Sequence, residues 1–355
     1  MSELKEYKCP ACGGAMEFDS KSQKMKCPYC DTEIEIKEFD VEPPEPSGEK
    51  EEPENAQWEE GETDKIKIFS CDSCGGEILA EDTSGAVICP FCGSKIVVKS
   101  QFADDLKPDY VIPFKLDKKK AKEAYHKHLE KKPFLPKIFR AENHIDEIKG
   151  VYVPFWLYDI DADADIVYEA EKLRIWRVGN TEFTEHKFYE AIRRGTIAFE
   201  HIPEDGSEKM DDSLMESVEP FDFKDAVPFN SAYLAGYVAD RYDVSVEDRR
   251  KRAGERVKES AENTFRETVT GYNVVRTRSS NVTTEKSRYW YALYPVWILN
   301  TTWHGKKYVF AMNGQTGKLV GDLPVDKSLF WKYVGIRTPL FAAIATALLF
   351  LIGMF

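Results

Sequence analysis

Residues 9–14 read CPACGG and residues 27–30 read CPYC, and these two cysteine motifs specify the local structure at the start of the chain. The same pair returns 62 residues later, as CDSCGG at 71–76 and CPFC at 89–92. Similarity at a fixed offset indicates a repeated structural unit. Each unit ends in an alternating apolar tail, which predicts a closing β-strand. The sequence therefore predicts two tandem zinc ribbons, over residues 1–39 and 65–100.

Each predicted ribbon offers four cysteine thiolates to one metal ion. Four soft thiolate ligands suit tetrahedral Zn²⁺, and a CxxC turn brings two sulfurs to the same metal. The predicted ligands are Cys9, Cys12, Cys27 and Cys30 in the first ribbon and Cys71, Cys74, Cys89 and Cys92 in the second. These are all eight cysteines of the chain, so none is left for a nucleophile or a lone disulfide. We expect two Zn²⁺ per chain; iron is the rival metal, although rubredoxins place a much longer spacer between their CPxCG motifs.

The residue after each CxxC turn often needs a positive φ angle. Glycine adopts such a conformation at little cost, and aspartate tolerates it. Gly13, Gly75 and Gly93 occupy three of these positions and Asp31 the fourth. We therefore expect left-handed backbone at all four.

The chain is acidic, with 355 residues and a formal net charge of −13. Charge of this sign repels nucleic-acid phosphates unless a local basic patch overrides it. Neither ribbon supplies such a patch, because residues 1–39 hold six lysines against eight acids and residues 65–100 hold four against four. A structural or protein-docking role is therefore favoured over nucleic-acid binding. The metal-type cysteine spacing, in a long chain without a signal peptide, predicts reduced cysteines in the cytosol.

The segment 40–64 between the ribbons holds eleven acidic residues, one lysine and four prolines. It has too little apolar surface to offset the entropy of ordering, which predicts a disordered acidic linker. Trp58 is its only aromatic residue, and we interpret it as a bystander or as the anchor of a short docking motif.

Residues 105–330 form one region of α+β character in which two motifs recur. VIPF at 111–114 is echoed by AVPF at 226–229, and PFWL at 154–157 is echoed by PVWI at 295–298. The echoes indicate either a duplication, with repeats over 105–200 and 220–330, or a chance similarity of strands.

A helical pattern lies between the two motifs of each half. Asp117 can cap the first helix, and Ser245 with Asp248 resembles the capping box of the second. Turns at 304–305 and 313–314 separate the last strands. We expect each half to be a helix on a small antiparallel sheet.

The final segment, 334–355, has 22 residues and Arg337 as its only charge. At ~1.5 Å per residue it is roughly 33 Å long, enough to cross the core of a bilayer. Trp331 and Tyr333 would form an aromatic belt, and the basic residues on the N-terminal side place the large domain in the cytoplasm. The sequence thus predicts a single-pass, tail-anchored protein of the cell membrane. A buried core helix is the alternative, although the segment lacks a polar face.

Two charged patterns have ordinary interpretations. Asp159, Asp161, Asp163 and Asp165 alternate, but the Gly and Glu of an EF-hand Ca²⁺ loop are missing, so the period of two indicates a strand with a solvated acidic face. The basic run 249–252 is interpreted as a solvated helix face, with a contact to anionic lipid as the alternative.

The motifs resemble those of a bacterial family of TFIIB-type zinc-ribbon-containing membrane proteins, over nearly the whole length. The resemblance rests on the paired cysteine motifs, on ALYPVW at 292–297, on FAMNGQTGK at 310–318, and on DLP at 322–324 before an apolar tail. Family members are often labelled primosomal helicase, and the lack of a P-loop argues against that label here. Some members resemble membrane anchors encoded beside phage-shock-protein-A-like and flotillin-like (SPFH) proteins. The resemblance thus implies an envelope-stress scaffold with such a cytoplasmic partner, and it brings no catalytic residues.

We therefore expect a membrane-anchored, non-enzymatic scaffold or adaptor whose zinc ribbons dock cytoplasmic proteins. P-loop, nucleophile-elbow, zinc-protease and dinucleotide-binding motifs are absent from the sequence. The first alternative is a nucleic-acid-binding accessory protein, which a basic groove would favour. The second is an enzyme with an unrecognised site in the α+β region, which a deep pocket with convergent polar groups would favour.

Overall fold

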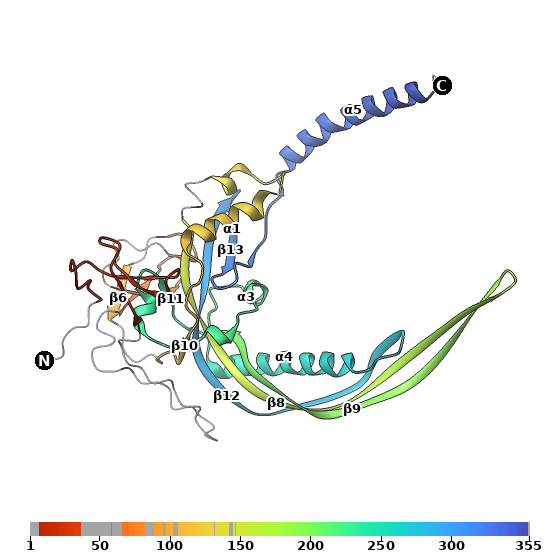
Figure 1. Cartoon of the computed structure of the whole chain (residues 1–355), viewed down its shortest axis with the longest axis horizontal. Coiled ribbons are helices and arrows are strands. Elements are labelled where there is room, and N and C mark those ends of the chain that lie inside the picture. Colours follow the sequence, from red (N-terminus) through yellow and green to blue (C-terminus); the bar gives the residue numbers. More distant parts are fainter. Residues whose placement is uncertain are drawn as a thin grey trace.

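The computed structural model describes residues 7–36, 58, 66–81, 89–94, 97–101, 106–130, 132–141, 145 and 147–353 (Figure 1). Most of the predicted linker over 40–64 and the last two residues of the predicted membrane span lie outside these residues.

Two long strands, β8 (Lys149–Val178) and β12 (Val274–Trp303), pair antiparallel and form the centre of the molecule. Every side chain from Val151 to Tyr158 is buried, which requires a covering layer on both faces of the sheet. Tyr152 and Trp156 belong to one core cluster, whereas Val153 and Phe155 belong to the other. The sheet thus separates two hydrophobic cores.

Helices cover these two faces. The first core contains residues of α1 (Lys118–Glu130) and α4 (Val246–Glu267), and the second contains residues of α3 (Asp212–Val218). The predicted caps of α1 and α4 are confirmed. The Asp117 carboxylate accepts a hydrogen bond from the Lys120 N–H at 2.7 Å, and the Ser245 hydroxyl accepts one from the Asp248 N–H at 3.2 Å.

The remaining strands, which include β4 (Ile66–Ser70), β5 (Glu77–Glu81) and β6 (Val97–Gln101), extend this sheet on both sides, in the order β10-β7-β12-β8-β11-β5-β4-β6. Besides this path, β9 pairs with β8, β13 pairs with β12, and β14 pairs with β13. The added strands of the body are β7 (Tyr110–Val111), β9 (Thr181–Asp205), β10 (Val227–Pro228), β11 (Val238–Asp240), β13 (Lys306–Asn313) and β14 (Leu319–Gly321). Short 3-10 helices are η2 (Lys137–Arg140), η3 (Phe223–Asp225) and η4 (Ser231–Leu234).

The predicted α+β class is confirmed. The order strand, helix, strand, strand occurs once as β7-α1-β8-β9, and again as β10-α4-β12-β13 with the additional short strand β11 between β10 and α4. The echoed motifs also meet in space, because Val111 of β7 lies opposite Val227 of β10. The duplication over 105–200 and 220–330 stays a prediction.

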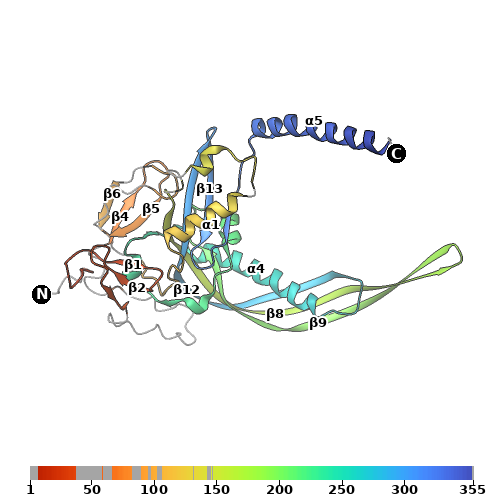
Figure 2. The same cartoon turned by 45° about the horizontal axis from the view of Figure 1, so that its top comes forward.

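The prediction of small sheets is wrong, because β8 and β9 continue together for 30 and 25 residues. We call residues 160–199 of this hairpin the arm; it curves away from the body (Figures 1 and 2). Along its first part Ala162 and Ala164 are buried under α4, whereas Asp161 and Asp163 are exposed. The predicted solvated acidic face is therefore confirmed at Asp161 and Asp163, whereas Asp159 and Asp165 are half-buried. The small alanines let α4 lie close to the strand.

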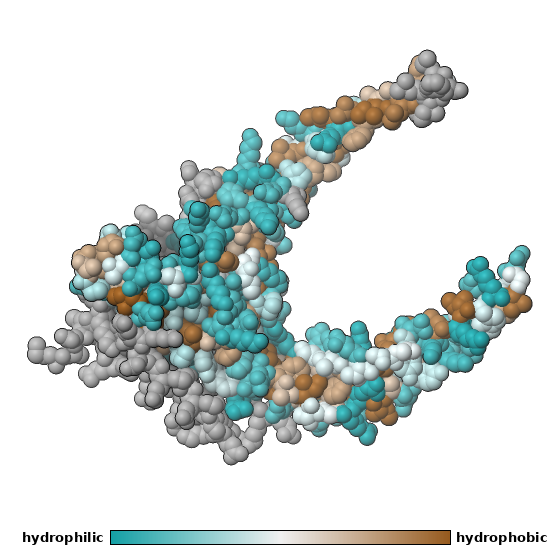
Figure 3. Space-filling model, in the orientation of Figure 1, coloured by the Kyte–Doolittle hydropathy of each residue, from teal (hydrophilic) through white to brown (hydrophobic). Residues whose placement is uncertain are grey.

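The C-terminal helix α5 (Lys327–Ile352) also projects from the body (Figures 1 and 2). Every residue from Gly335 to Leu348 is exposed, so the alternative of a buried core helix is wrong. Figure 3 shows apolar residues along this helix. In the part of the chain that the structure describes, no helix has the length and apolarity needed to cross a membrane, so the predicted span over 334–355 is not supported.

The basic run 249–252 forms the predicted solvated face only at Arg250 and Lys251, which are exposed. Arg249 and Arg252 both pair with Asp212 of α3, and Arg252 also pairs with Glu204 at 3.3 Å. The run joins α4 to α3 through ion pairs.

Trp58, the aromatic residue of the predicted linker, packs within the chain, edge-on against Phe229 with ring centroids 5.8 Å apart.

Candidate metal centres

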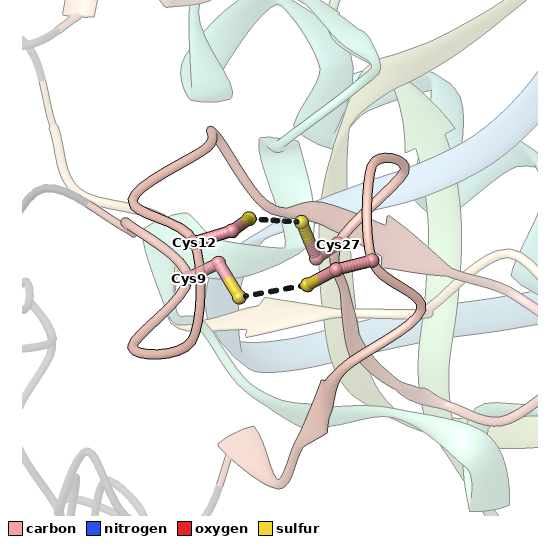
Figure 4. Close-up of side chains that lie close together, drawn as sticks. Cys9, Cys12 and Cys27 are labelled. Carbon is pink, nitrogen blue, oxygen red and sulfur yellow. Dashed lines mark hydrogen bonds between the residues drawn. The ribbon is translucent and has the colours of Figure 1, made fainter.

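The structure gathers the eight predicted cysteines into two sets of four, with the sulfurs of each set within 4.8 Å of one another. Figure 4 shows the first set, in which Sγ–Sγ distances are 3.3 Å for Cys9 and Cys30 and 3.5 Å for Cys12 and Cys27. In the second set they are 3.4 Å for Cys71 and Cys92 and 3.7 Å for Cys74 and Cys89.

These distances fit a shared metal ion and not a disulfide. A disulfide requires about 2.05 Å between sulfurs. A tetrahedron of sulfurs about 2.3 Å from a central Zn²⁺ has edges of about 3.8 Å. All eight cysteines are free, and both clusters are therefore positioned for metal binding.

All four CxxC turns have the same hydrogen bonds. In the first turn the Cys9 N–H donates to the Gly14 carbonyl at 2.8 Å, and the Gly13 N–H donates to the Cys9 carbonyl at 2.7 Å. Equivalent pairs of bonds begin at Cys27, Cys71 and Cys89. The predicted positive φ angles are confirmed at 72° for Gly13, 59° for Asp31, 70° for Gly75 and 77° for Gly93.

The second glycine of each CGG motif has a role that sequence reasoning missed. A Cβ atom on Gly14 would lie 2.6 Å from the ring of Tyr29, and one on Gly76 would lie 3.2 Å from the ring of Phe91. Each glycine makes room for the aromatic residue of the partner turn. The signal was present in the sequence, because both CGG motifs are matched by a CPxC motif with an aromatic third residue.

Local hydrogen bonds favour the thiolate form of one cysteine in each cluster, whereas burial raises the pKa of Cys89. The Gly14 N–H lowers the pKa of Cys12, but contacts with Cys30 and Cys27 outweigh that lowering and raise this pKa to about 12. Burial raises the pKa of the Cys9 thiol, but hydrogen bonds from the backbone N–H groups of Ala11 and Cys12 lower it by more than burial raises it, to about 6. Burial also raises the pKa of Cys92, and bonds from the Ser94 side chain and backbone lower it to about 6. The thiolate is the form that ligates metals, so each cluster holds a ready ligand at neutral pH.

Ribbon 2, formed by β4 (Ile66–Ser70), β5 (Glu77–Glu81) and β6 (Val97–Gln101), is part of the main sheet. Its strand β5 pairs antiparallel with β11, with Leu79 opposite Ala239. The side chains of Asn300 and Lys307 donate hydrogen bonds to the carbonyls of Pro90 and Phe91 in its second turn. That turn is consequently buried against β12 and β13.

Ribbon 1 has its own sheet, formed by β1 (Glu17–Asp19), β2 (Lys24–Lys26) and β3 (Glu33–Ile34). It packs on the body through Phe18, whose N–H donates to the Ala235 carbonyl at 3.1 Å and whose ring meets that of Tyr233. The Gln23 amide also donates to the Phe114 carbonyl at 2.8 Å. Its second turn, in contrast, faces solvent, and Tyr29 there is 77% exposed.

Two open clefts lie where the ribbons meet the body. The first, of about 560 Å³, lies between ribbon 1 and the start of β8, with Glu17, Lys118 and Lys149 in its lining. The second, of about 450 Å³, lies beside ribbon 2 and includes Glu77 and Arg241. Within the described residues the two cysteine sets are the only groups of His, Cys, Asp or Glu that could hold a metal.

Comparison with known proteins gives one informative similarity. No family model matches the chain, and no solved structure matches it. "Uncharacterized protein YdjG" of Bacillus subtilis (strain 168) is 31% identical over 321 residues, which cover 90% of each chain. A relative that is 31% identical over 90% of both chains shows common descent: the chain belongs to the family of the Bacillus subtilis protein YdjG.

Proposed function

We propose that this protein is a non-enzymatic scaffold at a membrane, and that ribbon 1 docks a cytoplasmic protein through its second CxxC turn. The proposal rests on one observation: the second CxxC turn is buried in ribbon 2 but exposed in ribbon 1. Pro90 and Phe91 of ribbon 2 are buried, and Phe91 is only 3% exposed. Pro28 and Tyr29, at the same positions of ribbon 1, are exposed.

Ribbon 2 indicates the chemistry that such a turn binds. Its carbonyls accept hydrogen bonds from an amide and an ammonium group, while its aromatic ring enters an apolar contact. Because the backbone of both turns has the same hydrogen bonds, a partner of ribbon 1 would offer similar donors beside an apolar pocket for Tyr29. Aromatic residues in such contacts often contribute a large share of the binding energy.

Zinc is the metal that we propose for both clusters. Four thiolates and a short spacer suit a closed, structural Zn²⁺ site, which leaves no open position for a substrate. Such a site would hold the exposed turn in one conformation and so reduce the entropy lost on docking.

Membrane attachment through α5 is also part of the proposal. The helix contains three basic residues and no acidic residue, and its exposed apolar side chains lie among the basic ones and continue beyond them. Transfer of such surface out of water is favourable, and basic residues beside it are attracted to anionic lipid. The family resemblance supports a partner similar to phage-shock protein A or to SPFH proteins.

The docking role is tested by capturing partners with the full chain from solubilised membranes, using wild type, Tyr29→Ala and the control Tyr189→Ala. Tyr189 is also exposed but lies on the arm, so the control makes the same change elsewhere. We expect Tyr29→Ala to bind the captured partner roughly 30-fold more weakly, as for a hot-spot residue worth about 2 kcal/mol. Tyr189→Ala should bind it like wild type. Equal capture by all three proteins would refute docking through this turn.

A further inference from the structure

The end of the arm is a two-stranded hairpin with an exposed aromatic pair. The first residue of β12 paired with β8 is Val274, opposite Glu171, so residues 172–187 extend beyond the third strand. Trp176 lies opposite Phe183, and their rings stack with centroids 5.7 Å apart. Trp176 is 41% exposed and Phe183 43%. Large apolar side chains left in water at the end of a projection indicate a contact surface.

The register of the strands shows which side chains share a face with this pair. Directly opposed residues of an antiparallel pair lie on one face, and the next residues on that face are two positions away. The face of Trp176 and Phe183 therefore also carries Arg174 opposite Glu185 and Lys172 opposite Lys187. We call these six residues the aromatic face.

The aromatic face is basic although the chain is acidic. It has three cations and one carboxylate, Glu185, which pairs with Lys187 at 3.4 Å, so the face carries two positive charges in excess in a chain with a net charge of −13. The Arg174 guanidinium lies over the Trp176 ring, 5.6 Å from its centroid. On the opposite face Arg177 is neutralised by Glu182 at 2.8 Å, beside Leu173 and Ile175. Charge thus distinguishes the two faces of the hairpin at the end of the arm.

The arm and α5 leave the body on the same side, away from the ribbons (Figures 1 and 2). Figure 3 shows apolar residues on both projections. The helix contains basic residues but no acidic residue, as described above. A single extended layer that is negatively charged at its surface and apolar inside would therefore be able to contact both the arm and α5.

We propose that the aromatic face of the arm binds the headgroup region of an anionic phospholipid bilayer. Tryptophan is enriched at membrane–water interfaces, where its ring is apolar and its N–H remains hydrated. Lysine and arginine near an anionic surface are attracted by its potential over about 10 Å. The arm would give the protein a second membrane contact that is independent of what the ribbons bind.

The test is hydrogen exchange on the full chain with and without vesicles. Phosphatidylcholine vesicles are compared with vesicles that also contain phosphatidylglycerol. We expect amides of residues 172–187 to exchange more slowly with the phosphatidylglycerol vesicles, and those of α4 to be unchanged. If the chain sediments with both kinds of vesicle but exchange at 172–187 never slows, the arm proposal is overturned while attachment through α5 stands. If the slowing appears without vesicles at high protein concentration, the surface binds a second copy of the chain and the lipid proposal is again overturned.

Matched variants identify the face that binds. Trp176→Ala with Phe183→Ala should abolish the slowing, whereas Leu173→Ala with Ile175→Ala on the opposite face should leave it in place. Lys172→Gln with Lys187→Gln should raise the lipid concentration needed for half-maximal slowing roughly 25-fold, at about fivefold per cation. Equal loss in both pairs of apolar variants would contradict a specific face, and an unchanged lysine variant would contradict the role of charge.

Discussion

The two glycines of each CGG motif have different tasks, one in backbone conformation and one in packing. Gly75 has a positive φ angle, whereas Gly76 lies against the ring of Phe91. The same division holds in ribbon 1, but there the ring belongs to the exposed Tyr29. An exposed ring can move away from an added methyl group, and a buried one cannot do so without disturbing its neighbours.

Gly76→Ala should therefore destabilise the protein more than Gly14→Ala. We expect Gly76→Ala to lower the free energy of unfolding by about 1–3 kcal/mol, the usual cost of overpacking a well-filled site. Gly14→Ala should cost less, because Tyr29 can rotate into solvent. Denaturant titration of the two variants beside wild type measures the difference, and a larger loss for Gly14→Ala would contradict this account.

Asp205 is a buried carboxyl group near the start of α3. Burial raises its pKa to about 8, against a smaller lowering by its bond from the Ser207 N–H and by nearby Arg249, while Asp212 and Asp243 raise it. The Ser207 N–H donates to Oδ1 at 3.0 Å, and Oδ2 has no hydrogen-bond partner among the described residues. The folded protein consequently holds a proton here that the unfolded chain releases near pH 4.

The stabilising effect of this proton is fully present below about pH 4 and is lost as the pH rises through about 8. The free energy of unfolding should fall across that window with a slope of at most about 1.4 kcal/mol per pH unit for one group. Asp205→Asn keeps the Oδ1 acceptor and cannot ionise, so it should be more stable than wild type at pH 9, with a difference that shrinks toward pH 5. Thermal unfolding at several pH values measures this, with the exposed Asp161→Asn as control. A pH-independent difference would rule out ionisation of Asp205 as the cause.

At the scale of elements, local signals were predictable and long-range pairing was not. The ligand cysteines, their positive-φ residues and the caps at Asp117 and Ser245 depend on neighbours within a few positions, so the sequence contains all that specifies them. The pairing of β5 with β11 depends on a distant segment. The length of β8 was missed because strands of about 5–6 residues are the norm, although no proline or glycine interrupts its sequence after Pro154.

The helix α5 is the element on which membrane attachment depends in our proposal. We expect the full chain to sediment with membranes and to resist alkaline carbonate, which strips proteins held by charge alone. A chain ending at Lys332 should be released, because it lacks the apolar part of α5. Sedimentation before and after carbonate treatment distinguishes the two proteins. If the shortened chain resists carbonate, attachment does not depend on α5.

At the scale of the whole molecule, the two metal centres differ in what they support. Ribbon 1 packs on the body with a separate sheet, whereas ribbon 2 shares the main sheet with β11 and β8. Metal binding supplies much of the folding free energy of a small ribbon. Loss of the second metal should therefore affect the body, and loss of the first should remain local.

Elemental analysis of protein purified without added metal should find two Zn²⁺ per chain. Cys12→Ser and Cys74→Ser should each reduce this to one. Only Cys74→Ser should lower the unfolding temperature of the body. This temperature is measured by the near-ultraviolet circular dichroism of the aromatic residues of the body. One metal per wild-type chain, or mainly iron, would contradict the assignment of two zinc ribbons. Equal effects of the two variants would contradict the structural difference between the two ribbons.

The shared sheet also has a consequence for the order of assembly during synthesis. Glu77 of ribbon 2 and its ion-pair partner Arg241 are 164 positions apart in the chain. The ribbon leaves the ribosome long before β11 exists, and its cysteines can take up metal at once because its own strands are local. A metal-loaded ribbon 2 would then present a finished strand edge on which β11 can pair as soon as it emerges. Starvation for metal during translation would remove that template, so an apo chain would fold slowly even where metal added later restores the same final structure.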